Sequence, residues 1–223
     1  MTDPSFPTAR IRIWDPWVRV THWGIAVLLV LSIASGLRGD FDTHFRAGYA
    51  LLALVLFRLA WGLVGSDTAR FAQFLKGPRA ALHHLAEFRT RAPETTPGHN
   101  PAGGWAVALL LALLLAQAGT GLMANDAIFT FGPLARLVGP DVSDAATSVH
   151  IRVWIALLAV VALHVAAVFA YAILRRTDLI GAMITGRKRL PADTAPPRMA
   201  SPLLAVALMA AASAVVWGIS RLG

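Results

Sequence analysis

The sequence contains no cysteine among its 223 residues. Disulfide bonds, iron–sulfur clusters, thiolate zinc sites and covalent haem attachment through a C-x-x-C-H motif are therefore excluded. Charged residues are also scarce, at 14% of the chain against about 25% in an ordinary soluble domain. Metal chemistry in this protein would rest mainly on histidine, of which there are seven.

Apolar residues are correspondingly abundant, at 57% of the chain, and the mean hydropathy is +0.61. They fall in five runs of about 20 residues, the length that crosses a bilayer as a helix. Since backbone in lipid must satisfy its own hydrogen bonds, we predict an all-α polytopic membrane protein. The expected spans are Trp17–Leu37, Ala47–Gly65, Gly103–Ala124, Arg152–Leu174 and Pro202–Ser220.

The net charge of +8 is distributed by topology rather than gathered into a basic groove, so nucleic acid is not an expected partner. One side of the membrane receives 15 basic and seven acidic residues, and the other receives five of each. The positive-inside rule then predicts a cytoplasmic N-terminus and an external C-terminus. Tryptophans near the cytoplasmic span ends are expected to form an interfacial belt: Trp14, Trp17, Trp23, Trp61 and Trp105.

Four histidines fall within or at the ends of spans, where ionisable side chains are costly and usually functional. His150 and His164 are 14 residues apart, which on a helix is about 21 Å of rise with an angular offset of roughly 40°. One helix thus presents two imidazoles at two depths. His22 enters the first span from the cytoplasmic side and is predicted to meet His164, and His44 opens the second span from outside and is predicted to meet His150.

Two histidines per site, with no carboxylate at the same depth, suit a porphyrin iron better than zinc, which takes four ligands. We therefore expect two haem b groups, held without covalent links between the helices of a bundle. A single membrane histidine is more often an interhelical hydrogen-bond partner, and that alternative stays open for each one. His99 is expected to cap the third span together with Asn100 and Pro101.

Arginines close to the histidines are candidate partners for haem propionates. Arg19, Arg58 and Arg152 are the candidates, while Arg46 fits interfacial snorkelling better. Snorkelling is the alternative for the others as well. Small residues are expected to let helices or a flat macrocycle approach the backbone closely: Gly36, Gly48, Gly119 and Gly121.

Several motifs together resemble the bacterial cytochrome b561 family, which includes the cytochrome b subunits of nickel-iron hydrogenases. They are DPWVRVTHW (Asp15–Trp23), His44-x-x-x-Gly48, LFRLAWGLVGS (Leu56–Ser66), GHNPAGG (Gly98–Gly104), QAGTGL (Gln117–Leu122), the His150 and His164 pair, and ITGRKR (Ile184–Arg189). The resemblance implies a bacterial inner-membrane protein with a four-helix core and two b-type haems, held by His22 with His164 and by His44 with His150.

These expectations divide the chain into a dihaem four-helix domain over residues 1–190 and a linker with a further C-terminal helix over 191–223. That fifth helix carries no ionisable group, so we interpret it as an anchor or a partner-binding helix. With this fifth helix, the chain is similar to members of the family that are associated with periplasmic c-type cytochromes.

We expect a respiratory dihaem conduit that passes electrons between membrane quinone or quinol and a periplasmic c-type cytochrome or other redox subunit. The loop Asn125–Val149 is expected to lie across the outer haem. An alternative is a quinone reductase that oxidises superoxide at that haem. A second alternative, of another class, is a non-catalytic anchor subunit or a transporter.

Overall fold

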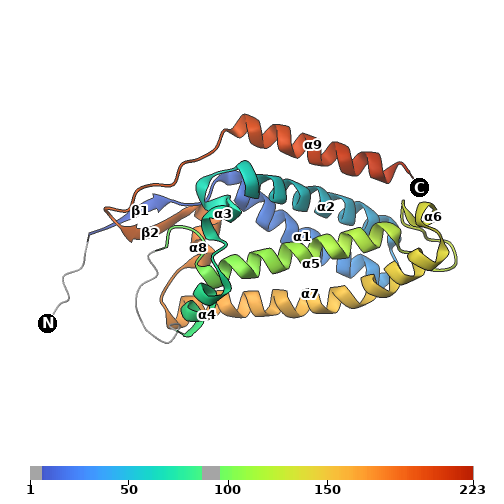
Figure 1. The fold of residues 1–223 in the computed structure, drawn as a ribbon, viewed down its shortest axis with the longest axis horizontal. Helices are drawn as coiled ribbons and strands as arrows, with labels where there is room; N and C mark the ends of the chain where they lie inside the picture. Colours follow the sequence, from blue (N-terminus) through green and yellow to red (C-terminus); the bar gives the residue numbers. More distant parts are fainter. Residues whose placement is uncertain (1–6, 87–95, 223) are drawn as a thin grey trace.

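The computed structural model describes residues 7–86 and 96–222, and helices dominate it (Figure 1). Five of the helices are long and apolar enough to cross a membrane. They are α1 (Pro16–Arg38), α2 (Phe41–Val64), α5 (Pro101–Met123), α7 (Pro140–Leu174) and α9 (Pro202–Ser220). The chain is an all-α polytopic membrane protein, as its hydropathy predicts.

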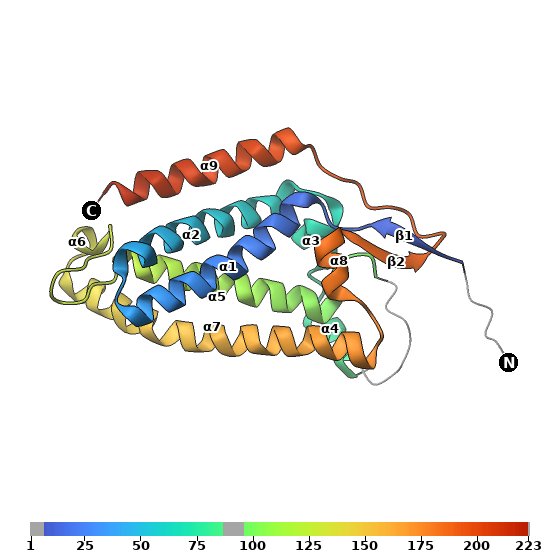
Figure 2. The same cartoon turned by 180° about the vertical axis from the view of Figure 1, so that it is seen from behind.

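Shorter elements connect these helices. They are strand β1 (Thr8–Arg12), the 3-10 turn η1 (Asp67–Ala69), helices α3 (Phe71–Phe74), α4 (Pro78–Ala86), α6 (Ala135–Val138) and α8 (Leu179–Thr185), and strand β2 (Arg187–Pro191). Strands β1 and β2 pair antiparallel into a two-stranded ribbon that the sequence analysis did not predict. The ribbon lies at the same end of the molecule as α3, α4 and α8, which we call the ribbon end (Figures 1 and 2).

Helices α1, α2, α5 and α7 run side by side as a four-helix bundle (Figures 1 and 2). Helix α9 packs along α2 on the outside of this bundle. The bundle centre is filled by Leu51 and Val55 of α2, Leu114 of α5 and Leu157 of α7, all buried. The opposite end from the ribbon carries α6 within residues 124–139, and we call it the loop end (Figure 1).

Local chemistry explains where the spans begin and end. Proline occupies the first turn of α1, α5, α7 and α9, where its missing N–H costs nothing. The turn between α1 and α2 is only two residues long because Gly39 takes a left-handed conformation with φ of 72° and Asp40 caps the next helix. His44 therefore lies in the first turn of α2.

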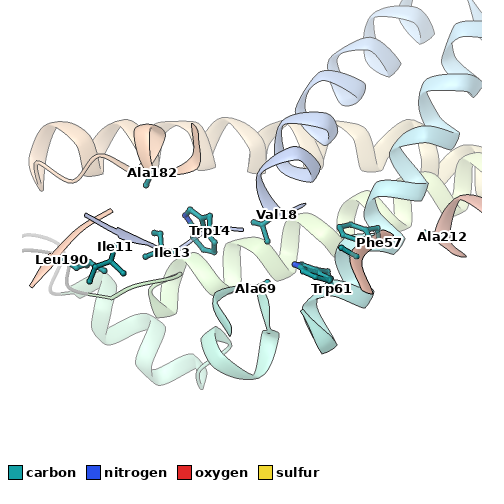
Figure 3. Close-up of a cluster of buried hydrophobic side chains, with 11 residues drawn as sticks. Ile11, Ile13, Trp14, Val18, Phe57, Trp61, Ala69, Ala182, Leu190 and Ala212 are labelled. Carbon is teal, nitrogen blue, oxygen red and sulfur yellow. The ribbon is translucent and has the colours of Figure 1, made fainter. Parts of the chain in front are cut away.

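A second hydrophobic cluster closes the ribbon end of the bundle (Figure 3). Ile13 and Trp14 follow the ribbon into this cluster, which also contains Phe57 and Trp61 of α2. The Asp15 carboxylate is buried among them, where Oδ1 accepts the N–H of Val18 at 2.9 Å and Oδ2 accepts the indole N–H of Trp61 at 3.0 Å. One carboxylate thus caps α1 and joins it to α2.

Several expectations from the sequence are wrong in detail. Helix α2 begins at Phe41 rather than Ala47, and helix α7 begins at Pro140 rather than Arg152, so the second half of the expected loop Asn125–Val149 is helical. Trp14 and Trp61 are buried in the ribbon-end cluster, so they do not join an interfacial belt. Trp23 and Trp105 are exposed, as an interfacial position requires.

Replacing Asp15 by alanine is expected to lower the free energy of unfolding by about 2 kcal/mol, because the variant loses a helix cap and leaves a buried indole N–H without an acceptor. Asp15→Asn keeps one acceptor oxygen, so it should lose about half as much. Thermal unfolding of the detergent-solubilised protein measures both. Equal losses for the two variants would contradict this role of the carboxylate.

Candidate functional site

The structure brings the four membrane histidines together as two pairs at different depths. The ring centre of His22 on α1 lies 6.3 Å from that of His164 on α7. At the other depth, the ring centres of His44 on α2 and His150 on α7 are 6.1 Å apart. We call the first the ribbon-end pair and the second the loop-end pair.

The spacing within each pair matches what one shared metal ion requires. A metal–nitrogen bond to imidazole is about 2.0 Å long, and the nitrogen is about 1.1 Å from its ring centre. Two imidazoles on opposite sides of one metal ion therefore have ring centres about 6.2 Å apart. Both observed separations lie within 0.1 Å of this value, so the distance within each pair is compatible with a shared metal ion.

Backbone carbonyls orient both rings of the loop-end pair. Nδ1 of His44 lies 2.8 Å from the carbonyl oxygen of Ser32, and Nδ1 of His150 lies 2.9 Å from that of Gln117. We assign the proton to each Nδ1, because a carbonyl only accepts. Nε2 of each ring is then the nitrogen that would ligate a metal, the arrangement usual for ligating histidine. In the structure, Nε2 of His44 is available for this role, while Nε2 of His150 lies 3.1 Å from the side-chain amide nitrogen of Gln117, which a bound metal would displace.

Two glycines leave the space that these rings occupy. A Cβ on Gly36 of α1 would lie 3.0 Å from Nδ1 of His44, and a Cβ on Gly121 of α5 would lie 2.8 Å from Cε1 of His150. Any larger residue at Gly121 would force the imidazole to move. A Cβ at Gly48 or Gly119 would have no neighbouring atom within 4 Å, so close packing of the chain does not require glycine at these two positions.

A cavity of about 290 Å³ lies beside the loop-end pair. His44, Gly48 and Leu52 line it from α2, and Gly121 and His150 line it from α5 and α7. Phe41, Phe45 and Tyr49 add aromatic surface, and Asn125, Asp126 and Thr130 close it from the loop. An apolar cavity with two convergent imidazoles fits a flat hydrophobic cofactor.

The loop over this cavity is held by one carboxylate. Oδ1 of Asp126 accepts the N–H groups of Ile128, Phe129 and Thr130, at 3.0, 2.9 and 2.7 Å. Hydrogen bonds from Thr130 and Ile128 to the ionised carboxylate lower the pKa of Asp126 to about 2. Asp126 is thus ionised at neutral pH, and the loop it organises presents the Phe129 side chain, which is 90% exposed.

Near the ribbon-end pair, three buried polar atoms have no hydrogen-bond partner within the described residues. They are Oγ1 of Thr21, Nδ1 of His22 and Nη1 of Arg58 on α2. The Arg58 side chain is only 6% exposed and lies over the ring of Phe71, 5.3 Å from its centre. No carboxylate in the described part of the chain is within 4 Å of it. The charge of Asp15 acts on Arg58 from beyond that distance. The unpartnered nitrogens of Arg58 and His22 fit a bound group that carries negative charge.

The other arginines predicted as cofactor partners contact backbone in the structure. Arg19 donates to the carbonyl oxygens of Met183 and Ile184, at the end of α8. Arg152 donates to the carbonyl oxygen of Ser148, one turn earlier in its own helix. Arg46 is exposed at the loop end, in agreement with snorkelling.

His99 does not cap α5, because the cap is Asn100, whose Oδ1 accepts the N–H of Gly103 at 2.7 Å. The His99 ring instead packs between Trp14 and Phe74, with ring centres 4.8 and 4.9 Å away. Burial and the nearby positive charge of Arg58 lower the pKa of His99 to about 3. His99 is therefore a neutral aromatic side chain of the ribbon-end cluster at physiological pH.

Gln117 is a site residue that the sequence analysis missed. Its side-chain amide nitrogen lies 3.1 Å from Nε2 of His150, and its Oε1 is buried without a partner among the described residues. The signal that would have identified it is its position as a lone amide within the apolar run of α5. Within the described ranges, no three His, Asp or Glu side chains cluster as metal ligands, so each pair offers two protein ligands.

Comparison with known proteins identifies relatives of this chain. A family profile described as prokaryotic cytochrome b561 matches residues 13–186. A protein of Bradyrhizobium diazoefficiens named as a probable Ni/Fe-hydrogenase B-type cytochrome subunit is 25% identical over 216 residues, which cover 80% of this chain and 86% of the relative. A protein of the same name from Rhizobium leguminosarum bv. viciae is 27% identical over 161 residues, 65% of this chain and 66% of the relative. No solved structure matches significantly.

Gly121→Ala is expected to displace the His150 ring, since the added Cβ would lie 2.8 Å from that ring, and so to lower the haem content of the purified protein. Gly119→Ala, two residues earlier on α5, has no atom within 4 Å and is the matched control. The pyridine haemochrome content of the purified variants measures the effect. Equal haem content in both variants would contradict a role for Gly121 in seating the ring.

Proposed function

The chain belongs to the prokaryotic cytochrome b561 family of membrane proteins that carry haem b and transfer electrons, and we propose that it is a transmembrane conduit with two haems. The single observation that carries the proposal is the presence of two histidine pairs, each with the separation of two ligands of one metal ion. Helix α7 supplies one histidine to each pair, about 21 Å apart along its axis.

His22 and His164 would hold the haem at the ribbon end, and His44 and His150 would hold the haem at the loop end. Haem iron supplies one-electron reduction and oxidation when it is bound. Two histidines on one iron leave no open coordination position, which favours electron transfer over reactions of oxygen at the metal. The chain's own part is to fix the rings through the carbonyls of Ser32 and Gln117 and to surround the site with apolar side chains.

Arg58 is the arginine whose surroundings best support contact with a haem propionate. It follows His44 on α2 by 14 residues, the same spacing that separates His150 from His164 on α7. On a helix that spacing puts Arg58 near the same face as His44 and at the depth of the other pair. Its buried guanidinium has a nitrogen without a partner among the described residues. A propionate would satisfy both the charge and the nitrogen.

The charge distribution supports the orientation, with the ribbon end in the cytoplasm of a bacterium and the loop end in the periplasm. Electrons would pass between membrane quinone or quinol and a periplasmic partner, a c-type cytochrome or another redox subunit. Two relatives named as hydrogenase cytochrome subunits support a redox enzyme as the source or receiver of electrons. The cavity beside His44 and His150, at the loop end, supports exchange on that side.

Residues 1–190 would form the electron-transfer domain, and residues 191–223 would add an accessory helix. Helix α9 packs mainly against α2, on the outside of the bundle, which supports this division. Apolar side chains of α9 such as Leu203, Val206 and Trp217 are exposed, which suits contact with lipid or with a membrane-embedded partner.

We expect two haem b groups per chain, measured by a reduced-minus-oxidised spectrum and a pyridine haemochrome assay. His44→Ala and His164→Ala should each bind one haem, because each removes one ligand of a different pair. His83→Ala, on the surface helix α4, is the matched control and should bind two. One haem in the parent protein, or none, would contradict the proposal.

Arg58→Gln is expected to lower the midpoint potential of the ribbon-end haem, because a positive charge stabilises the reduced, more negative state. A unit charge about 10 Å away at an effective dielectric constant of about 20 contributes about 1.7 kcal/mol, or about 70 mV for one electron. Arg58→Lys keeps the charge and should shift the potential by less. Redox titration followed by absorbance measures both, and an unchanged potential in Arg58→Gln would contradict the assignment.

A further inference from the structure

Four arginines share one face of the ribbon. Arg10 lies directly opposite Arg189, and Arg12 lies opposite Arg187. Because side chains alternate along a strand, these four project from the same face, and all four are exposed. The other face is buried against the ribbon-end cluster through Ile11 and Leu190. This arginine face is not used by the electron-transfer site.

The arrangement places like charges directly opposite one another, which destabilises a strand pair. The ribbon cannot slip to separate them, since a shift of one residue would expose its buried face. In the described ranges, none of the four is within 4 Å of a carboxylate. The carboxylates of Asp15 and Asp178 accept backbone N–H groups at helix starts instead. Among the described residues the arginine face thus has no acidic partner, so its charge is available to a ligand.

The position of the ribbon indicates which anions it meets. Strand β1 ends at Arg12, four residues before α1 begins, so extended chain separates them by at most about 14 Å. The headgroup region reaches about 5–8 Å beyond the hydrocarbon on each side of a bilayer, and an arginine side chain extends several ångströms further. Figures 1 and 2 show the ribbon continuing outward from the helix ends. Arg12 and Arg187 form the pair nearer the membrane, and Arg10 and Arg189 lie about 7 Å beyond.

We propose that the arginine face binds the phosphate groups of anionic phospholipids at the membrane surface. Guanidinium groups bind phosphate through two parallel hydrogen bonds, so opposed arginines suit a phosphate between them. Each basic residue close to an anionic membrane surface strengthens binding about fivefold, and the attraction falls away within about 10 Å in salt. The membrane-proximal pair therefore contributes more than the distal pair.

The test uses the full-length protein in detergent and measures its binding of short-chain phosphatidylglycerol by native mass spectrometry. Short-chain phosphatidylcholine and inorganic phosphate serve as comparison ligands. Three double variants remove equal charge: Arg12→Gln with Arg187→Gln, Arg10→Gln with Arg189→Gln, and Arg79→Gln with Arg176→Gln. The last pair is exposed but lies outside the ribbon, so it is the matched control.

We expect phosphatidylglycerol to bind the parent protein more tightly than phosphatidylcholine. Loss of the membrane-proximal pair should weaken that binding about 25-fold, and loss of the distal pair or of the control pair should weaken it less. Haem content and thermal unfolding check that each variant is folded. Should the first variant fail to fold, Arg12→Lys with Arg187→Lys replaces it, and it should weaken binding by removing the paired hydrogen bonds alone.

Three results would overturn the proposal. Equal losses in all three double variants would mean unspecific attraction to positive charge. Equal binding of inorganic phosphate would identify a free anion rather than a lipid as the ligand. A larger loss for the distal pair would point to an acidic surface of a soluble protein beyond the membrane. None of these readouts depends on electron transfer, so the proposed function can fail or stand separately.

Discussion

Depth matching between imidazoles on different helices is the constraint around which this bundle is arranged. Helix α7 fixes two levels through His150 and His164, and the tight turn at Gly39 makes α1 and α2 run in opposite directions. That hairpin brings His22 to one level and His44 to the other. At the loop-end pair, Gly36 and Gly121 leave room for the two imidazole rings. The backbone carbonyls of Ser32 and Gln117 orient these rings.

The two levels differ in their surroundings. A packed cluster that includes Trp14 and Trp61 closes the ribbon end, and Arg58 is a buried cation at the same end, over the ring of Phe71. The loop end has a cavity, covered by a loop that the Asp126 carboxylate organises. A buried positive charge raises the potential of a nearby redox group, and an open cavity admits a partner. The fold thus supports different tasks for the two ends.

Hydropathy was sufficient to predict the spans, and the limits of α9 are those expected from the sequence, Pro202–Ser220. It underestimated the length of α7, because residues 140–151 include Asp141 and Asp144, which lower the hydropathy of that segment. A helix can still continue through these residues where it extends beyond the lipid. The histidine pairing followed from helical rise and topology alone. The ribbon was missed because its strands are five residues each and lie about 175 residues apart in the sequence. No local sequence pattern therefore predicts that they pair.

Side-chain direction was the harder part of the site. Proximity in sequence made Arg19 and Arg152 candidates, yet each donates to a backbone carbonyl. The carbonyl acceptors of Ser32 and Gln117 have no sequence signature, since every residue carries a carbonyl group. Only the folded chain shows which of them a ring reaches.

Low-temperature electron paramagnetic resonance of the oxidised protein tests the central claim most directly. Iron held by two imidazoles is low-spin, and the anisotropy of its signal grows as the two ring planes approach a right angle. The ring planes meet at 85° in the loop-end pair and at 55° in the ribbon-end pair. The account predicts two low-spin ferric signals of equal intensity, with the more anisotropic one lost in His44→Ala. A single low-spin signal, or a high-spin signal in the parent protein, would contradict it.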